Sequence, residues 1–121
     1  MASGVIKRPT GDSITEDVSN DFSSEYYSRT NNDPIKYFRN GNVVVLNATI
    51  TVNTPYTSFP GITVLGGLPT PTNPVTISFP SFGTDVAHVS LWIRVTAVGN
   101  LNLRFGTAGR SYNVNFTYIC S

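Results

Sequence analysis

Hydrophobic and polar residues alternate along four stretches of the chain, residues 43–52, 86–98, 101–105 and 112–119. A period of two is typical of a β-strand with one buried face, because successive side chains point to opposite sides of a sheet. The pattern therefore predicts a half-buried antiparallel sheet. Its predicted inward residues are Val44, Leu46, Ala48, Ile50 and Val52 in the first stretch, Val89, Leu91, Ile93, Val95 and Ala97 in the second, and Tyr112, Val114, Phe116 and Tyr118 in the last.

Turn signals separate these stretches and delimit further strands. Asn40-Gly41, between residues 35–38 and 43–52, predicts a hairpin with a type I′ turn. Prolines and glycines predict a loop over most of the segment that follows, with a short strand at 62–65. Further predicted features are a strand at 75–79, a turn at Gly83, a turn at Gly99-Asn100 and a glycine loop at 106–110. About seven short strands of this kind are typical of an all-β antiparallel β-sandwich or jelly roll.

The N-terminal third has a different pattern. Residues 1–12 mix glycine, proline and charge without a period, which predicts an extended arm or a disordered start. Residues 14–28 are ambiguous: Ser13 and Glu16 fit a capping box and apolar residues recur every four positions, which favours a short helix. The serines, asparagine and aspartate between them favour turns instead. We expect an N-terminal arm or attachment segment over 1–33 and one β domain over 34–121.

Charge is scarce in this chain of 121 residues, where Asp, Glu, Lys and Arg together make up 12%. Soluble domains usually contain roughly 25%, so the composition favours self-association. Residues 1–33 hold three bases and six acids, and residues 34–121 hold five bases and one acid. The scattered bases do not predict nucleic-acid binding. The sequence predicts no membrane span and no secretory leader, and hence synthesis in a reducing cytoplasm.

The sequence offers little catalytic equipment. Asp85 and His88 are three residues apart, so in a strand they would point to opposite faces. Cys120 is the only cysteine, which excludes an intramolecular disulfide. It could form a nucleophile pair with His88, but a small buried hydrophobic role is favoured. We therefore expect no enzyme activity, no metal site and no cofactor.

Recognition chemistry is easier to find. On the predicted polar face of strand 86–98, Trp92 and Arg94 lie with Ser90 and Thr96. Tryptophan can stack on a sugar ring, and arginine can bond hydroxyls or anionic groups, so both residues are candidate ligand contacts. The favoured alternative is burial of Trp92 against a second sheet or a neighbouring subunit. Tyr56 and Phe59 in the proline-rich loop are further candidates, with local loop packing as an equal alternative.

From Tyr37 onward, the order of short motifs resembles a known family. The motifs are NGNVVVLNATITV, ITVLGGLPTP, WIRVTAVGNLNLRF and the closing YNVNFTYI. In this order they resemble the C-terminal head domains of bacteriophage tail and baseplate receptor-binding proteins. One departure is the central Leu-Pro motif, which is reduced here to Leu68-Pro-Thr-Pro71.

The resemblance implies a homotrimeric jelly-roll-like head on a phage or prophage tail, which binds a host-surface saccharide. The partners it implies are further copies of the chain and other tail or baseplate proteins, and the place it implies is the virion. It carries over no site residues. It also favours loop and short strand over helix in the N-terminal third. The alternatives are a purely structural virion or tail accessory protein and a trimeric lectin-like module.

Overall fold

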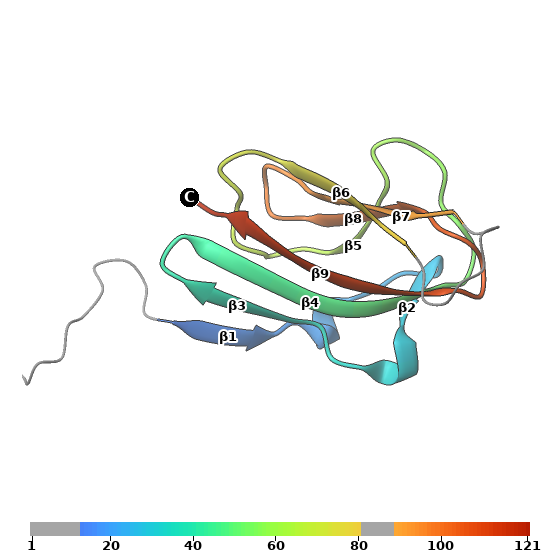
Figure 1. Ribbon diagram of the computed structural model, residues 1–121, viewed down its shortest axis with the longest axis horizontal. Helices are drawn as coiled ribbons and strands as arrows, with labels where there is room; N and C mark the ends of the chain where they lie inside the picture. Colours follow the sequence, from blue (N-terminus) through green and yellow to red (C-terminus); the bar gives the residue numbers. More distant parts are fainter. Residues whose placement is uncertain (1–12, 81–88) are drawn as a thin grey trace, which may run out of the picture.

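The computed structural model describes residues 13–80 and 89–121 of the chain, and in this part the protein is all-β with two antiparallel sheets (Figure 1). The first sheet has the order β1-β3-β4-β2, with β9 on the free side of β4, and the second has the order β5-β8-β7-β6. The strands are β1 (Ile14–Asp17), β2 (Tyr27–Arg29), β3 (Lys36–Asn40), β4 (Val43–Val52), β5 (Ile62–Leu65), β6 (Val75–Phe79), β7 (Leu91–Val95), β8 (Leu101–Phe105) and β9 (Ser111–Ile119).

Strand β4 organises the first sheet. It pairs with β9 over its length, from Val43 opposite Ile119 to Thr51 opposite Ser111. On its other side it pairs with β3 near its start and with β2 near its end. The alternating stretch 43–52 therefore forms the centre of the sheet.

The two sheets face each other across one hydrophobic core (Figure 1). The inward faces predicted for β4 and β9 are confirmed, because every residue assigned to them is buried. From the second sheet, Leu91, Ile93 and Val95 of β7 and Leu101 and Leu103 of β8 complete the core. Burial of these branched and aromatic side chains is the main driving force for the fold.

The predicted hairpin is present, but its turn differs from the expected type I′. Asn40 belongs to β3 and pairs with Val43, so the two loop residues are Gly41 and Asn42. Of these, only Gly41 has a positive φ, 64°. A type I′ turn needs positive φ at both central positions, whereas type II′ places glycine at the first. The turn is therefore centred on Gly41-Asn42, one residue later than the Asn40-Gly41 pair predicted.

The long strand predicted for 86–98 is shorter in the structure. Residues 86–88 lie outside the described residues, as do Gly83, Asp85 and the segment 1–12. Val89 and Ala97, expected inside, are exposed. The Val89 N–H bonds the Thr107 hydroxyl instead of a neighbouring strand, and a tight turn in which Gly99 N–H bonds Thr96 O ends the ladder after Val95.

No helix forms over 14–28, so that expectation is wrong and its alternative of loop and short strand is confirmed. The segment holds β1, the single 3-10 turn η1 (Ser19–Asp21) and the start of β2. Its apolar residues Val18, Phe22 and Tyr26 pack on the core from separate points of an irregular path. Because β1 pairs with β3 and β2 pairs with β4, residues 13–33 are built into the first sheet.

The C-terminal end of the chain is fastened on two sides. Cys120 is buried, and its N–H bonds Asn42 O at 2.8 Å. On the opposite side Thr72 N–H bonds Ile119 O, and Ser121 N–H bonds Thr70 O, both at 2.9 Å. The last residues thus join the β3–β4 turn to the loop before β6.

Candidate ligand-binding face

The outward face of the second sheet carries the candidate residues of β7. Leu91, Ile93 and Val95 point into the core, so Trp92 and Arg94 between them point outward. The register places Ser78 and Arg104 on either side of Trp92, and Thr76 and Asn102 on either side of Arg94. The polar face predicted for this strand therefore exists over its described part.

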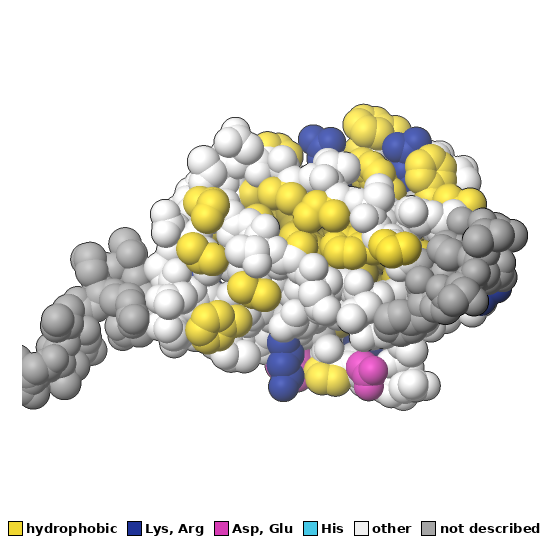
Figure 2. Space-filling view, in the orientation of Figure 1, with side chains coloured by type: hydrophobic (Ala, Val, Ile, Leu, Met, Phe, Trp, Pro, Cys, Tyr) yellow, Lys and Arg dark blue, Asp and Glu magenta, His cyan; other side chains and the backbone are white. Residues whose placement is uncertain are grey.

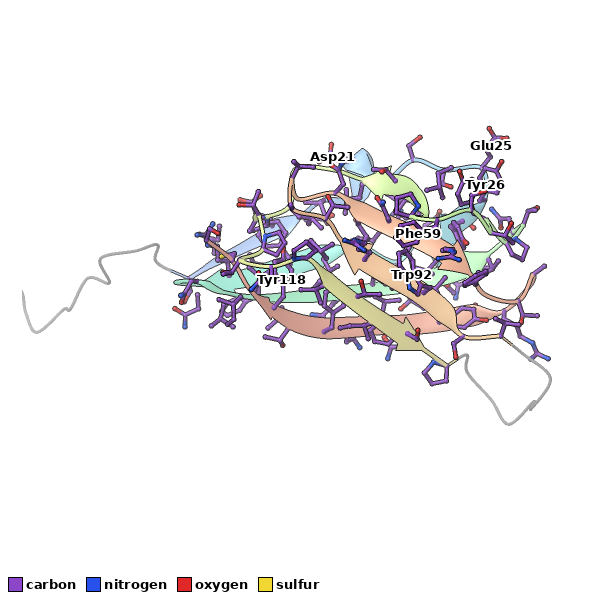
Figure 3. The ribbon with its side chains drawn as sticks, turned by 90° about the horizontal axis from the view of Figure 1, so that it is seen from above. Asp21, Glu25, Tyr26, Phe59, Trp92 and Tyr118 are labelled. Carbon is purple, nitrogen blue, oxygen red and sulfur yellow. The ribbon has the colours of Figure 1, made fainter. Side chains whose placement is uncertain are left out.

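Trp92 lies on this outer face and not between the sheets. It is half-buried. The expectation that it packs against the other sheet is therefore wrong, and the cover that it has comes from a loop of its own chain. Its ring centroid is 6.2 Å from that of Phe59, with 60° between the ring planes. Figure 3 shows the two labelled side chains close together over the second sheet.

Phe59 reaches this position because the loop before β5 lies directly on the sheet. Gly61 has a φ of +91°, and a Cβ atom there would come within 2.8 Å of Leu103 O and 3.1 Å of the Trp92 ring. Only glycine allows so close an approach. The buried Asn102 amide fastens the loop, since it donates to Pro60 O at 3.1 Å. Phe59 itself remains 67% exposed.

Arg104 joins the two aromatic rings and was not singled out from the sequence. Its guanidinium carbon lies 5.3 Å from the Trp92 ring centroid, 5.5 Å from that of Phe59 and 4.2 Å from that of Phe105. Contacts of this kind attract a cation to the face of an aromatic ring. The alternation of 101–105 could have indicated its outward position, because a strand that buries Leu101 and Leu103 points Asn102 and Arg104 outward.

The Phe105 ring contacts the Arg104 guanidinium, and the Phe105 backbone has an unusual conformation. Its φ is 64°, which is rare for a bulky residue. Two hydrogen bonds fix this conformation: Phe105 N–H donates to Tyr56 O at 2.7 Å, and the Tyr27 hydroxyl donates to Phe105 O at 2.9 Å. The position of the guanidinium thus depends on a stretch of backbone that is hydrogen-bonded on both sides. Strained residues are often found at functional sites.

Arg94 lies on the same face, diagonally across from Arg104. It is half-buried, and within the described part of the chain its guanidinium has no hydrogen-bond or ion-pair partner. Diagonal neighbours on adjacent strands lie about 7–8 Å apart. The cluster on this face therefore consists of Trp92, Phe59 and Arg104. Arg94 lies beside it on the same face of the sheet.

Tyr56 is not part of this cluster. Its ring packs edge-on against Tyr26, with the centroids 5.1 Å apart. Its backbone N–H donates to the Tyr27 hydroxyl at 3.1 Å. In Figure 3, Tyr26 lies away from Phe59 and Trp92. The structure therefore gives Tyr56 the local packing that was its alternative.

The other chemical candidates are not brought together. His88 and Asp85 lie outside the described residues, and Cys120 is buried at the end of β9. Over residues 13–80 and 89–121, no pocket and no group of three or more potential metal ligands is found. In the same part of the chain, no helix is long and apolar enough to span a membrane.

Comparison with known proteins gave no relatives. No protein-family model, no curated protein and no solved structure matches the chain.

Proposed function

We propose that this protein is a non-enzymatic recognition module, a β-sandwich or jelly-roll head of a phage or prophage tail that binds a saccharide on the host surface. The observation that carries the proposal is the cluster of Trp92, Phe59 and Arg104 on the outer face of the second sheet. The motif order from Tyr37 onward supplies the phage context. In that context the protein would be part of the virion, made in the host cytoplasm and joined to other tail or baseplate proteins.

The chemistry of the cluster suits a sugar. The flat apolar face of a pyranose ring packs well on an aromatic ring, and hydroxyls at its edge accept bonds from arginine N–H groups. Arg104 donates from Nε to Thr57 O at 3.3 Å, and within the described residues its terminal N–H groups have no hydrogen-bond acceptor. A contiguous exposed apolar patch is a common mark of a binding surface, and Phe59 forms one with the neighbouring Trp92.

Trimerisation, the second part of the proposal, has a candidate surface on the side where β6 and β9 meet. These two strands form edges of different sheets and contain no charged residue. Figure 2 shows a band of hydrophobic side chains across this side. The half-buried Val75, Ile77 and Phe79 of β6 lie here. The ring centroids of Phe79 and Phe116 are 6.1 Å apart. An uncharged edge with partly covered apolar residues suits association with further copies of the chain. That the assembly is a trimer is what the resemblance to phage head domains implies.

The recognition proposal is tested by binding to bacterial cells and purified envelope polysaccharide. Phe59→Ala and Trp92→Ala should each weaken binding about five- to tenfold, since aromatic contacts of this kind contribute about 1–1.5 kcal/mol. Phe38→Ala, which removes a ring of 40% exposure from the outer face of the first sheet, is the matched control and should bind as wild type. Phe59 is exposed, so the Phe59 variant reports on binding even if the Trp92 variant unfolds.

The alternative is a structural tail accessory protein. It is favoured by the outer face of β4 and β9, which carries only uncharged side chains and includes the exposed Val43 and Ile119. A trimer that binds no host envelope, but assembles with purified tail proteins, would support this role over recognition. A trimer that binds neutral sugars of many origins would support the lectin-like alternative.

A further inference from the structure

The outer face of the second sheet is positively charged as well as aromatic. Strands β5, β6, β7 and β8, as the structure describes them, contain two charged residues, Arg94 and Arg104, and both point outward. The acidic residues of the described part all lie between positions 16 and 33. Figure 3 shows two of them, Asp21 and Glu25, at the margin of this face and away from Trp92. In the described part, neither guanidinium is paired with a carboxylate.

The two arginines are placed to act on one group. Arg104 is opposite Trp92, and Arg94 is two residues further along β7 on the same face. At a diagonal separation of about 7–8 Å between backbones, both side chains can reach an anion that lies beside the Trp92 ring. Like charges so close together repel each other, and a bound anion would relieve that repulsion.

Arg104 is also held in place before any ligand arrives. Three aromatic rings surround its guanidinium, and Nε is bonded to Thr57 O. Aromatic rings are only weak hydrogen-bond acceptors, so the terminal N–H donors of Arg104 remain available. Arginine presents such donors as a planar fork that matches a phosphate or carboxylate group. Prior orientation reduces the entropy cost of binding.

We propose that this face binds an anionic saccharide, whose sugar ring stacks on Trp92 and Phe59 while its phosphate or carboxylate group is bound by Arg94 and Arg104. This inference rests on the proposed recognition function and names the ligand class for it. A single-stranded nucleic acid also combines phosphate with stacking rings. It is less well matched, because nucleic-acid sites track the backbone with a longer row of positive charges.

The test uses matched sugars that differ in charge. Trp92 is the only tryptophan, so its indole N–H gives a single resonance in a ¹⁵N NMR spectrum that reports on this face. The full chain is titrated with mannose 6-phosphate and mannose, and with galacturonate and its methyl ester. A short oligothymidylate is titrated in parallel. The phosphate and carboxylate pairs distinguish the two sources of charge.

We expect at least one charged sugar to shift the Trp92 resonance and to bind about tenfold or more tightly than its neutral partner, since hydrogen bonds to charged groups contribute about 1.5–3 kcal/mol. Arg94→Gln and Arg104→Gln should remove that preference. Arg104→Lys keeps the charge but loses the planar fork of N–H donors, and should retain part of the preference for the charged sugar. Lys36→Gln removes the same charge from an exposed site on the first sheet and should change nothing.

Two results would overturn the inference while leaving saccharide recognition intact: equal binding of charged and neutral sugars, or host binding that persists in both arginine-to-glutamine variants. Tighter binding of oligothymidylate than of either charged sugar would also overturn it, in favour of a nucleic-acid ligand. If none of the sugars shifts Trp92 and the host-cell assay is negative too, the recognition function itself is wrong.

Discussion

The Tyr27 hydroxyl connects two segments beneath the candidate binding face. It donates to Phe105 O at 2.9 Å and accepts from Tyr56 N–H at 3.1 Å, while its ring is fully buried. Removal of this one oxygen would leave a partly buried donor and a partly buried acceptor without their partner. Such groups are costly because water cannot replace the lost bond.

Tyr27→Phe is therefore expected to lower the free energy of unfolding by about 1–3 kcal/mol, measured by urea denaturation. It should also loosen Phe105, and with it Arg104, so the indole resonance of Trp92 should move. Tyr26→Phe is the control, because the half-buried Tyr26 ring packs on Tyr56 but its hydroxyl has no hydrogen bond within the described residues. Equal stability of the two variants would show that the Tyr27 hydroxyl is not needed.

Three buried phenols make stability sensitive to alkali. Burial raises the pKa of Tyr27, Tyr37 and Tyr118 above the ordinary value of 10.0. A raised folded pKa stabilises the protein fully below the unfolded pKa, and this stability is lost as the pH rises through the folded value. We expect urea midpoints to be constant just below pH 10 and to fall above it.

The Tyr118→Phe variant separates this effect from general charge repulsion. It removes the phenol whose hydroxyl bonds Pro69 O at 2.8 Å, so its stability should be lower at neutral pH but should decline less steeply in alkali. An alkaline decline as steep as that of wild type would exclude Tyr118 as a source.

At the scale of residues, the sequence identified Trp92, Arg94 and Phe59 but not Arg104. The first three are conspicuous by type and by position on a predicted strand or loop. The role of Arg104 depends on a cross-strand register and on a loop laid over the sheet by Gly61, and neither is encoded locally. Tyr56 was as conspicuous as Phe59, yet it packs inward on Tyr26.

At the scale of elements, the loops of the second sheet contain two glycines with similar positive φ angles and different surroundings. Gly99 and Gly67 have φ values of +81° and +77°. A Cβ atom at Gly99 would overlap Leu68 O, whereas one at Gly67 would meet nothing within 4 Å. The pair thus separates backbone strain from steric overlap.

Gly67→Ala is expected to cost about 1–2 kcal/mol, the usual penalty for a side chain in the left-handed region. Gly99→Ala should cost more, because it also displaces Leu68, whose N–H bonds Gly99 O at 3.0 Å. That bond alone contributes about 1 kcal/mol. Thermal unfolding of both variants provides the comparison, and equal losses would mean that the contact at Leu68 relaxes freely.

Elements with a clear alternation were predictable from the sequence, and elements with a mixed pattern were not. Strands β4, β5, β6, β8 and β9 lie where apolar and polar residues alternate between turn residues. The period of four over 14–28 was misleading, since its residues reach the core from separate turns and Ile14 is exposed. The short length of β7 could not be foreseen, because threonine hydroxyls replace the ladder on both sides of it. Thr107 accepts from Val89 N–H before the strand, and Thr96 accepts from Asn100 N–H after it.

At the scale of the whole molecule, the two sides of the fold differ in how their edges are covered. The edge of β5 is partly covered by the N-terminal segment, where Ser23 N–H bonds Val64 O at 2.9 Å. On the opposite side, β9 pairs with β4 alone among the described strands, and β6 with β7 alone. Edge strands without charge favour pairing with another chain.

A lysine in the middle of this edge should therefore disrupt the proposed trimer. Asn115→Lys adds a charge at an exposed position of β9, and light scattering after gel filtration should change from the trimer mass to that of the 13.1 kDa chain. Ser58→Lys, an equally exposed change in the loop before β5, should remain trimeric. A monomeric wild type would contradict the trimer, and a trimeric Asn115→Lys would place the interface elsewhere.

The buried cysteine at the end of β9 also gives access to the kinetics of the native state. Because Cys120 is the only thiol and is held between the β3–β4 turn and the loop at residues 70–72, a thiol reagent can reach it only when that junction opens. The labelling rate under native conditions would then measure how often the C-terminal strand separates at its end. That opening frequency could be compared in the presence and absence of a ligand bound on the other sheet.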